Sequence, residues 1–159
     1  MIIPYQSQYA AQAAQVWNEV VRAGNAFPQE SSLTPAEADA FFLSQSYTGI
    51  WVEGATVCGL YILHPNNVGR CGHICNASYA VDSAARGRHI GEALVRHCLQ
   101  QAKALGFRIL QFNAVVATNT AALALYQKLG FTKMAVIPGG FRMPDGSFAD
   151  IIPHYITLS

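Results

Sequence analysis

The fold is decided by the stretch Tyr79-Ala80-Val81-Asp82-Ser83-Ala84-Ala85-Arg86-Gly87-Arg88-His89-Ile90-Gly91. It leads from an extended run, His73 to Val81, through a basic turn into a helix whose apolar stripe continues to a stop at Gly106. The first turn of a helix offers unpaired backbone N–H groups, and glycines let a ligand approach the backbone closely. The stretch is therefore typical of a pyrophosphate cradle; the alternative is an ordinary strand-to-helix turn with solvated arginines.

The spacing of the glycines excludes two other kinds of phosphate-binding loop. The chain has no Gly-x-x-x-x-Gly-Lys-Ser/Thr loop, and Gly87 and Gly91 do not belong to a Gly-x-Gly-x-x-Gly pattern. A Rossmann domain would also carry an acidic residue about 20 positions beyond such a pattern. A dinucleotide-binding domain is therefore disfavoured.

Before this stretch, the sequence predicts a strand, two helices and a hairpin. Apolar residues at helical spacing indicate a helix over Tyr9–Ala23. Thr34-Pro35-Ala36-Glu37 supplies an N-cap, a first-turn proline and a capping-box acid for a second helix that reaches about Ser44. The other segments are expected to be a strand near Met1–Tyr5, a hairpin of Tyr47–Val52 and Ala55–Leu63 around Glu53-Gly54, and a break in the sheet at His64-Pro65-Asn66-Asn67.

After the stretch, the pattern predicts further strands and one more helix. Phe107–Val116 is a strongly apolar strand, and Thr118 or Asn119 can cap a helix that Gly130 ends. Strands are expected at Phe131–Pro138 and Ala149–Leu158, with Gly139-Gly140, Pro144 and Asp145-Gly146 marking the loop between them. This order of elements predicts an α/β fold, a mixed sheet with helices packed on it, as a single domain over residues 1–159.

A second informative segment is Asn119-Thr120-Ala121-Ala122-Leu123-Ala124-Leu125-Tyr126-Gln127-Lys128-Leu129-Gly130-Phe131. A polar cap begins a short helix that presents Asn119 and Tyr126 and ends in Leu-Gly-Phe. Together the two segments resemble the GNAT superfamily of N-acetyltransferases. The first motif of that family is Gln/Arg-x-x-Gly-x-Gly/Ala, and the second is an Asn-x-x-Ala-x-x-x-Tyr helix that closes with Gly-Phe. The resemblance covers the chain end to end.

The resemblance implies a GNAT fold with a splayed, mixed and mostly antiparallel sheet of six to seven strands and about four helices. It also implies acetyl-CoA as cosubstrate, no metal, and a coenzyme wedged between the strand ending at Val81 and the strand ending near Val115. The cofactor-binding residues implied in this way are Tyr79, Val81, Arg86, Gly87, Arg88, His89, Ile90, Gly91, Asn119, Ala122 and Tyr126. His89 stands where the family usually has glycine, so its side chain must point away from the pyrophosphate or hydrogen-bond to it.

A narrower resemblance lies in Ile74–Val81, Gln111–Asn119 and Pro138–Arg142. These segments look like the GNAT branch that includes the fungal acetyltransferases of proline analogues such as azetidine-2-carboxylate, together with bacterial relatives of unsettled substrate. In that branch three asparagines serve the active site, and they correspond here to Asn76, Asn113 and Asn119. An amide on an apolar strand needs a partner, which is either a ligand or a backbone group where the strands splay.

The expected reaction is direct attack of a neutral amine on the thioester in a ternary complex. Tyr126 is the candidate that protonates the departing thiolate, and a backbone N–H within Tyr79–Val81 is the candidate that stabilises the oxyanion. Asn76 and Asn113 are expected to orient the amine. No histidine or carboxylate on the inner strands is identified as the general base, and Glu30 is either a remote proton acceptor or a solvated loop acid.

The acceptor is expected to be a compact amine, an amino acid or a proline analogue rather than a basic peptide tail. Aromatic side chains with little charge between them predict a small pocket, and the substrate-binding residues expected are Phe27, Asn76, Tyr79, Asn113 and Phe141. The alternative function is a non-catalytic regulatory module of the same fold that binds acyl-CoA, which the presence of Asn119 and Tyr126 disfavours.

Composition limits the remaining possibilities. The 159 residues have a formal net charge of +1 and are 12% charged, so nucleic acid and anionic membranes are not expected partners, and low charge favours a homodimer. No apolar run approaches the roughly 18 residues that span a bilayer. The four cysteines show neither zinc-site spacing nor the density of a disulfide scaffold, which predicts reduced core thiols and a cytoplasmic protein.

Overall fold

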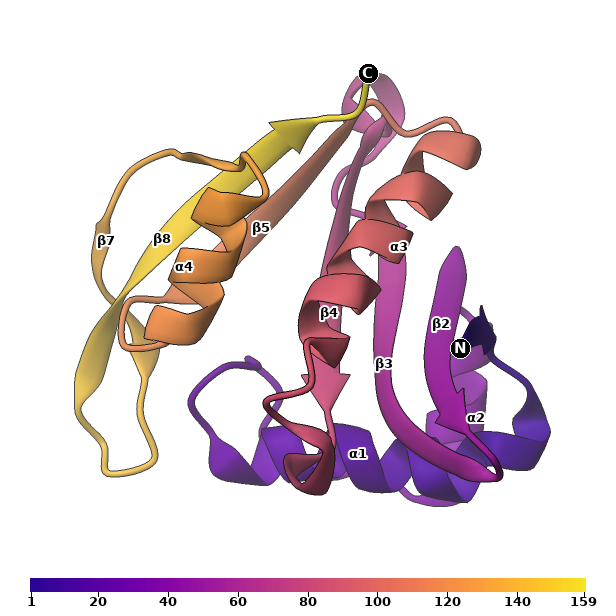
Figure 1. Cartoon of the computed structure of the whole chain (residues 1–159). Coiled ribbons are helices and arrows are strands. Elements are labelled where there is room, and N and C mark those ends of the chain that lie inside the picture. Colours follow the sequence, from indigo (N-terminus) through magenta and orange to yellow (C-terminus); the bar gives the residue numbers. More distant parts are fainter.

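The structure is a computed structural model that describes residues 1–159. An open sheet of eight strands carries four α-helices (Figure 1). In chain order the elements are β1 (Ile2–Pro4), α1 (Ala10–Ala23), α2 (Pro35–Leu43), β2 (Tyr47–Glu53), β3 (Thr56–Pro65), β4 (Ile74–Val81), α3 (Ile90–Ala104), β5 (Ile109–Val116), α4 (Thr120–Lys128), β6 (Thr132–Lys133), β7 (Ile137–Arg142) and β8 (Phe148–Thr157).

The sheet is antiparallel except at one place. Its strand order is β1-β2-β3-β4-β5-β8-β6, with β7 paired to β8, and β4 and β5 are the parallel neighbours. The capping box at Thr34 is present, because its side chain and that of Glu37 each accept the other residue's backbone N–H. The α/β class and the mixed, mostly antiparallel sheet with four helices are confirmed.

Two apolar cores lie on opposite faces of the sheet, and β3 contributes to both. Its side chains alternate, so that Leu60 and Ile62 join the core beneath α1 and α2 while Tyr61 and Leu63 join the core beneath α3. The first core holds Trp17, whose ring lies 4.4 Å from that of Phe27 between centroids. This contact holds the segment between α1 and α2 against that core.

The sheet splays between β4 and β5. The two strands pair only through Ile74 with Ile109 and Cys75 with Leu110, whereas β3 accompanies β4 from Pro65 to Gly59. Figure 1 shows the consequence: one arm of the sheet contains β2, β3 and β4, the other contains β5 and β8, and the arms diverge from their meeting point near the C-terminus. From Asn76 onward, the edge of β4 that faces β5 has no strand partner.

The C-terminal arm differs in detail from the sequence prediction. The expected strand over Phe131–Pro138 is divided: Thr132–Lys133 forms β6, and residues 137–138 begin the additional eighth strand, β7. This strand also includes Gly139 and Gly140, which were expected to mark a loop. A Cβ atom at Gly140 would lie 2.5 Å from the Ile151 side chain. Glycine here permits close approach to β8 rather than a turn.

Two smaller expectations are also corrected. The break expected at His64 begins later, because β3 continues through Pro65, so His64 belongs to the strand. Cys71 is exposed, unlike the buried Cys58, Cys75 and Cys98, and all four thiols are free. None of the helices combines the length and the apolar character required to cross a bilayer.

The entrance to α3 contains a strained residue. His89 is the N-cap of α3 with φ 60° and ψ 21°, and it is the only non-glycine residue with a positive φ. This left-handed conformation costs about 1–2 kcal/mol for a residue with a Cβ atom. The position therefore favours glycine for a conformational reason, which explains why the resembling motif usually has glycine there.

We expect His89→Gly to raise the free energy of unfolding by about 0.5–1 kcal/mol, measured by chemical denaturation. The relieved strain exceeds the roughly 0.4–1 kcal/mol that glycine loses through greater freedom of the unfolded chain. His73→Gly is the matched control, because exposed His73 has no positive φ and the same change should lower stability there. Equal losses in both variants would contradict the assignment of strain to His89.

Candidate active site

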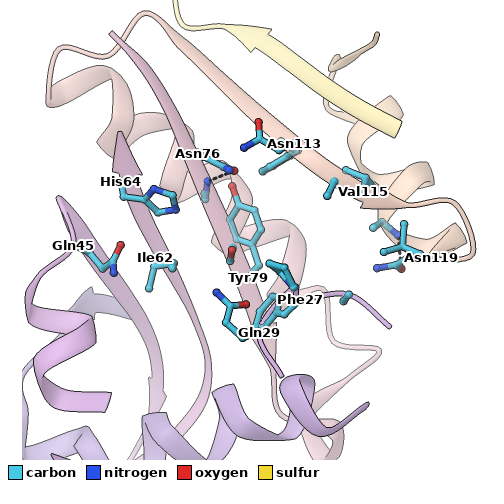
Figure 2. Close-up of a pocket in the computed structure, with 18 of the residues that line it drawn as sticks. Phe27, Gln29, Gln45, Ile62, His64, Asn76, Tyr79, Asn113, Val115 and Asn119 are labelled. Atoms are coloured by element: carbon cyan, nitrogen blue, oxygen red, sulfur yellow. Dashed lines mark hydrogen bonds between the residues drawn. The ribbon is translucent and has the colours of Figure 1, made fainter. Parts of the chain in front are cut away.

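A cleft of about 570 Å³ occupies the splay between the two arms (Figure 2). Its walls come from β3, β4, β5, the start and middle of α4, the segment between α1 and α2, and the end of α2 with the residues that follow it. Seven of the residues predicted from the sequence line it: Phe27, Asn76, Tyr79, Asn113, Asn119, Ala122 and Tyr126. No lysine, arginine, aspartate or glutamate lines the cleft, so its polar groups are amides, hydroxyls and one imidazole.

The amides form a cluster at the point where the strands part. Asn66 and Asn113 are paired reciprocally, with Nδ2 of each donating to Oδ1 of the other at 3.1 and 2.8 Å. Asn76 Nδ2 donates to the same Asn66 oxygen at 3.4 Å, and Gln111 Nε2 donates to Asn113 Oδ1 at 3.2 Å. Asn66 thus joins β4 to β5 beyond their last backbone pair.

The direction of each bond in this cluster follows from one backbone group. The Ala77 N–H donates to Asn76 Oδ1 at 2.8 Å, and since an N–H only donates, the amide orientation of Asn76 is fixed. Asn76 Nδ2 then requires the Asn66 oxygen as acceptor, which leaves the Asn66 nitrogen to donate to Asn113. The oxygens of Asn66 and Asn113 each accept two bonds, while every one of the three amides keeps one N–H. The cluster therefore mainly offers donors.

A β-bulge places Asn113 in the cleft. The pairing of β5 with β8 is irregular between Phe112 and Val115, so the usual alternation of side chains is interrupted and both of these residues enter the same buried core. Asn113 lies within the irregular segment and is exposed to the cleft beside Ala114. Without the bulge, Val115 could not share a face with Phe112.

Tyr126 and Tyr79 occupy the deep part of the cleft. The Tyr126 ring packs on Phe112 and Phe131 with centroid separations of 4.5 and 5.3 Å. Burial raises the pKa of the Tyr126 hydroxyl, and the nearby Cys98 thiol adds to the rise. Burial also raises the pKa of Tyr79, whose hydroxyl is fully enclosed. Both phenols therefore keep their protons at neutral pH.

The predicted phosphate cradle lies beyond the cleft, at the end of β4. The first helical hydrogen bond of α3 runs from Ala93 N to His89 O at 3.1 Å, so the N–H groups of residues 90–92 have no acceptor within the helix. A Cβ atom at Gly91 would meet only Val81, at 3.8 Å, which leaves open space in front of these groups. Arg88 forms an ion pair with Glu53, whereas Arg86 is exposed.

Comparison with known proteins decides the family. Residues 14–131 match the model of the acetyltransferase (GNAT) family. The chain belongs to the GNAT family. N-acetyltransferase aca1 of Schizosaccharomyces pombe is 30% identical to this GNAT chain in an alignment of 143 residues that covers 79% of this chain and 68% of that protein.

Solved structures agree with this assignment. A GCN5-related N-acetyltransferase from Kribbella flavida superposes with a TM-score of 0.91 and 31% identity, covering 99% of this chain and 97% of that one. The putative acetyltransferase yncA from Salmonella typhimurium, solved with its cofactor acetyl-CoA, has a TM-score of 0.93 at 18% identity and covers 100% of this chain and 94% of its own. The latter similarity supports the fold alone.

Three predicted residues of this GNAT chain lie outside the cleft or have a partner within the protein. Phe141 is buried beside a neighbouring hollow on the β7 side and does not line the cleft, although Phe27 lines both. Glu30, considered as a remote proton acceptor, is exposed and forms an ion pair with Arg142 of β7. Asn119 lines the cleft but also caps α4, since its Oδ1 accepts the Ala122 N–H at 3.2 Å.

Sequence reasoning missed two side chains of the cleft region, Asn66 and His64. Both belong to the segment that was expected to break the sheet. The sequence shows the pair Asn66-Asn67 directly after an apolar strand. Such a pair is as typical of a turn as of a ligand-binding site, so it did not identify Asn66. Only the antiparallel register, with His64 opposite Asn76, brings this segment against the splay.

Proposed function

We propose that this protein transfers an acetyl group from acetyl-CoA to the amine of a small amino acid or cyclic imino acid, by direct attack in a ternary complex. The observation that carries the proposal is the uncharged cleft at the splay, where the asparagine cluster offers spare N–H donors. The protein's membership of the GNAT family supports acetyl transfer as the class of reaction.

The coenzyme side of the proposal is supported by two features that need a ligand. The N–H groups at the start of α3 face open space at Gly91, which suits a pyrophosphate held by the turn from Arg86 to Gly91. The unpaired edge of β4 at Tyr79 and Val81 suits an extended chain that carries amides, because it offers backbone donors and acceptors. One N–H of this edge would then stabilise the oxyanion.

The acceptor side is supported by the chemistry of the amides. A carboxylate only accepts hydrogen bonds, so it matches the spare N–H groups of Asn66, Asn76 and Asn113. A polyamine or a lysine-rich tail would require carboxylates, and none lines the cleft. The volume of about 570 Å³ lies within the usual range for small-molecule sites.

The finer assignment is to the branch of proline-analogue acetyltransferases. It is supported by the clustering of Asn76 and Asn113 and by the presence of Asn119 in the same cleft, since these are the three positions on which the resemblance rests. An N-acetyltransferase that is 30% identical and comes from a fungus is consistent with it. Tyr126 would protonate the departing thiolate, because its phenol keeps its proton at neutral pH.

We expect Gly91→Leu to weaken acetyl-CoA binding at least about tenfold in isothermal titration, since the side chain would fill the space in front of the free N–H groups. Unfolding stability should be retained, because the new Cβ atom meets no atom closer than 3.8 Å. Gly91→Ala, which adds one methyl group, should have a smaller effect. Unchanged affinity in the leucine variant would contradict the cradle assignment.

We expect coenzyme A release to be faster with azetidine-2-carboxylate and proline than with azetidine and pyrrolidine, the same rings without the carboxylate. The difference in kcat/KM should be about tenfold to hundredfold, because a hydrogen bond to a charged group contributes about 1.5–3 kcal/mol. Asn113→Ala should reduce kcat/KM for the acids while leaving the ring amines and acetyl-CoA affinity unaffected.

Other outcomes of this screen identify the alternatives. Equal rates for acids and ring amines would show that the acceptor's carboxylate is not recognised. Acetylation of polyamines or peptide N-termini alone would show that the acceptor is not a small amino acid. Tight acetyl-CoA binding with no turnover of any amine would favour the non-catalytic acyl-CoA-binding module.

We expect Tyr126→Phe to lower kcat by about a hundredfold while acetyl-CoA affinity stays within about twofold. Phenylalanine keeps the packing on Phe112 and Phe131 and removes only the proton donor. Because burial raises the tyrosine pKa, its protonated form persists as pH rises, and the unaltered protein should show no alkaline loss of kcat below about pH 10. An unchanged kcat in the variant would assign Tyr126 to packing.

A further inference from the structure

His64 projects into the cleft from the penultimate position of β3 (Figure 2). It lies directly opposite Asn76 in the antiparallel register of β3 and β4, so both side chains are on the same face of the sheet. Ile62 and Ser78 form the next pair on that face, and they also line the cleft. The imidazole is therefore on the amide side of the cleft, beside the residues that would hold the acceptor.

An amine acceptor arrives at neutral pH mostly as an ammonium ion, and its nitrogen must lose a proton before it can attack. His64 is the only side chain lining the cleft that remains as a candidate general base, because no carboxylate or lysine lines it and both phenols hold their protons. The elements around His64 present uncharged groups: Ser44 and Gln45 after α2, Gln29 before it, Asn76 from β4 and Asn113 from β5.

The ring nitrogens of His64 are distinguished by a local contact. Nδ1 lies 3.0 Å from the carbonyl oxygen of Pro65. A carbonyl oxygen only accepts, so in the neutral ring Nδ1 carries the hydrogen and Nε2 carries the lone pair. The histidine is thereby held in the tautomer whose free nitrogen can accept a proton.

The other candidates for this role have different surroundings. Glu30 is exposed and paired with Arg142. His97 lies on α3, where Nδ1 is 2.9 Å from the Tyr61 hydroxyl. His154 is fully enclosed in β8, with Nδ1 2.7 Å from the Ile152 carbonyl oxygen. None of these side chains lines the cleft.

We propose that His64 is the general base of the acetyl transfer and removes the proton of the acceptor ammonium at Nε2, directly or through one water molecule. The proposal rests on the acetyl transfer proposed above. The neutral amine then forms the C–N bond, the C–S bond breaks, and the second proton of the nitrogen is transferred to the sulfur by way of Tyr126. His64 releases the first proton to solvent, so each turnover yields the amide, the free thiol and one proton.

The test is the pH dependence of kcat/KM for His64→Gln with a carboxylate-bearing acceptor, from about pH 6 to about pH 10. We expect a deficit of about a hundredfold near neutral pH. The deficit should shrink as pH rises towards the pKa of the acceptor ammonium, because solvent then supplies the neutral amine. His73→Gln is the matched control, since exposed His73 lies outside the cleft and its pH profile should equal that of the unaltered protein.

The outcomes separate this proposal from the one on which it rests. A deficit of the same size at every pH would assign His64 a positioning role and overturn the proposal, as would no deficit. An acetyl-CoA affinity of the variant within about twofold of that of the unaltered protein verifies that the variant is folded. If glutamine disturbs β3, the pH dependence of kcat/KM is measured with His64→Asn instead. If the unaltered protein acetylated no amine, the proposed acetyl transfer would be wrong, and the assignment of His64 as its base would be wrong as well.

Discussion

The parallel contact between β4 and β5 is the constraint on which the rest of the structure depends. It consists of two residue pairs, and the strands separate immediately after them. A parallel neighbour requires a crossover, which α3 supplies, and this places the helix start directly after the free end of β4. The exposed start of the helix is thus a consequence of this connection, and it lies at the end of β4 where the two strands are apart.

Where the strands separate, Asn66 provides hydrogen-bond partners for side-chain amides on both strands. Backbone pairing ends at Cys75, yet Asn76 and Asn113 follow on strands that are mostly apolar. The reciprocal pair of Asn66 and Asn113, with Asn76 attached, satisfies these groups internally and continues the link between the arms by one more step.

Local patterns predicted the helices and the general course of the sheet, but not its detailed pairing. The capping box at Thr34 and the helix ends at Gly106 and Gly130 depend on residues that are close in the sequence, so they can be recognised from the sequence. The bulge at Asn113 depends on the register with β8, and the place of His64 depends on the register with β4. The splay was expected only because of the family resemblance, since no periodicity in β4 or β5 indicates that the two strands part.

The place of the free β4 edge between the two arms has a consequence for the behaviour of the protein in concentrated solution. A free strand edge is a template on which another chain can pair and begin to aggregate. The free edge of β4 lies between two arms, and the ion pair between Glu30 and Arg142 connects the segment before α2 to β7 on the opposite arm. A foreign β-strand would therefore have to enter the space between the arms to pair with this edge, whereas a slender ligand needs less room there.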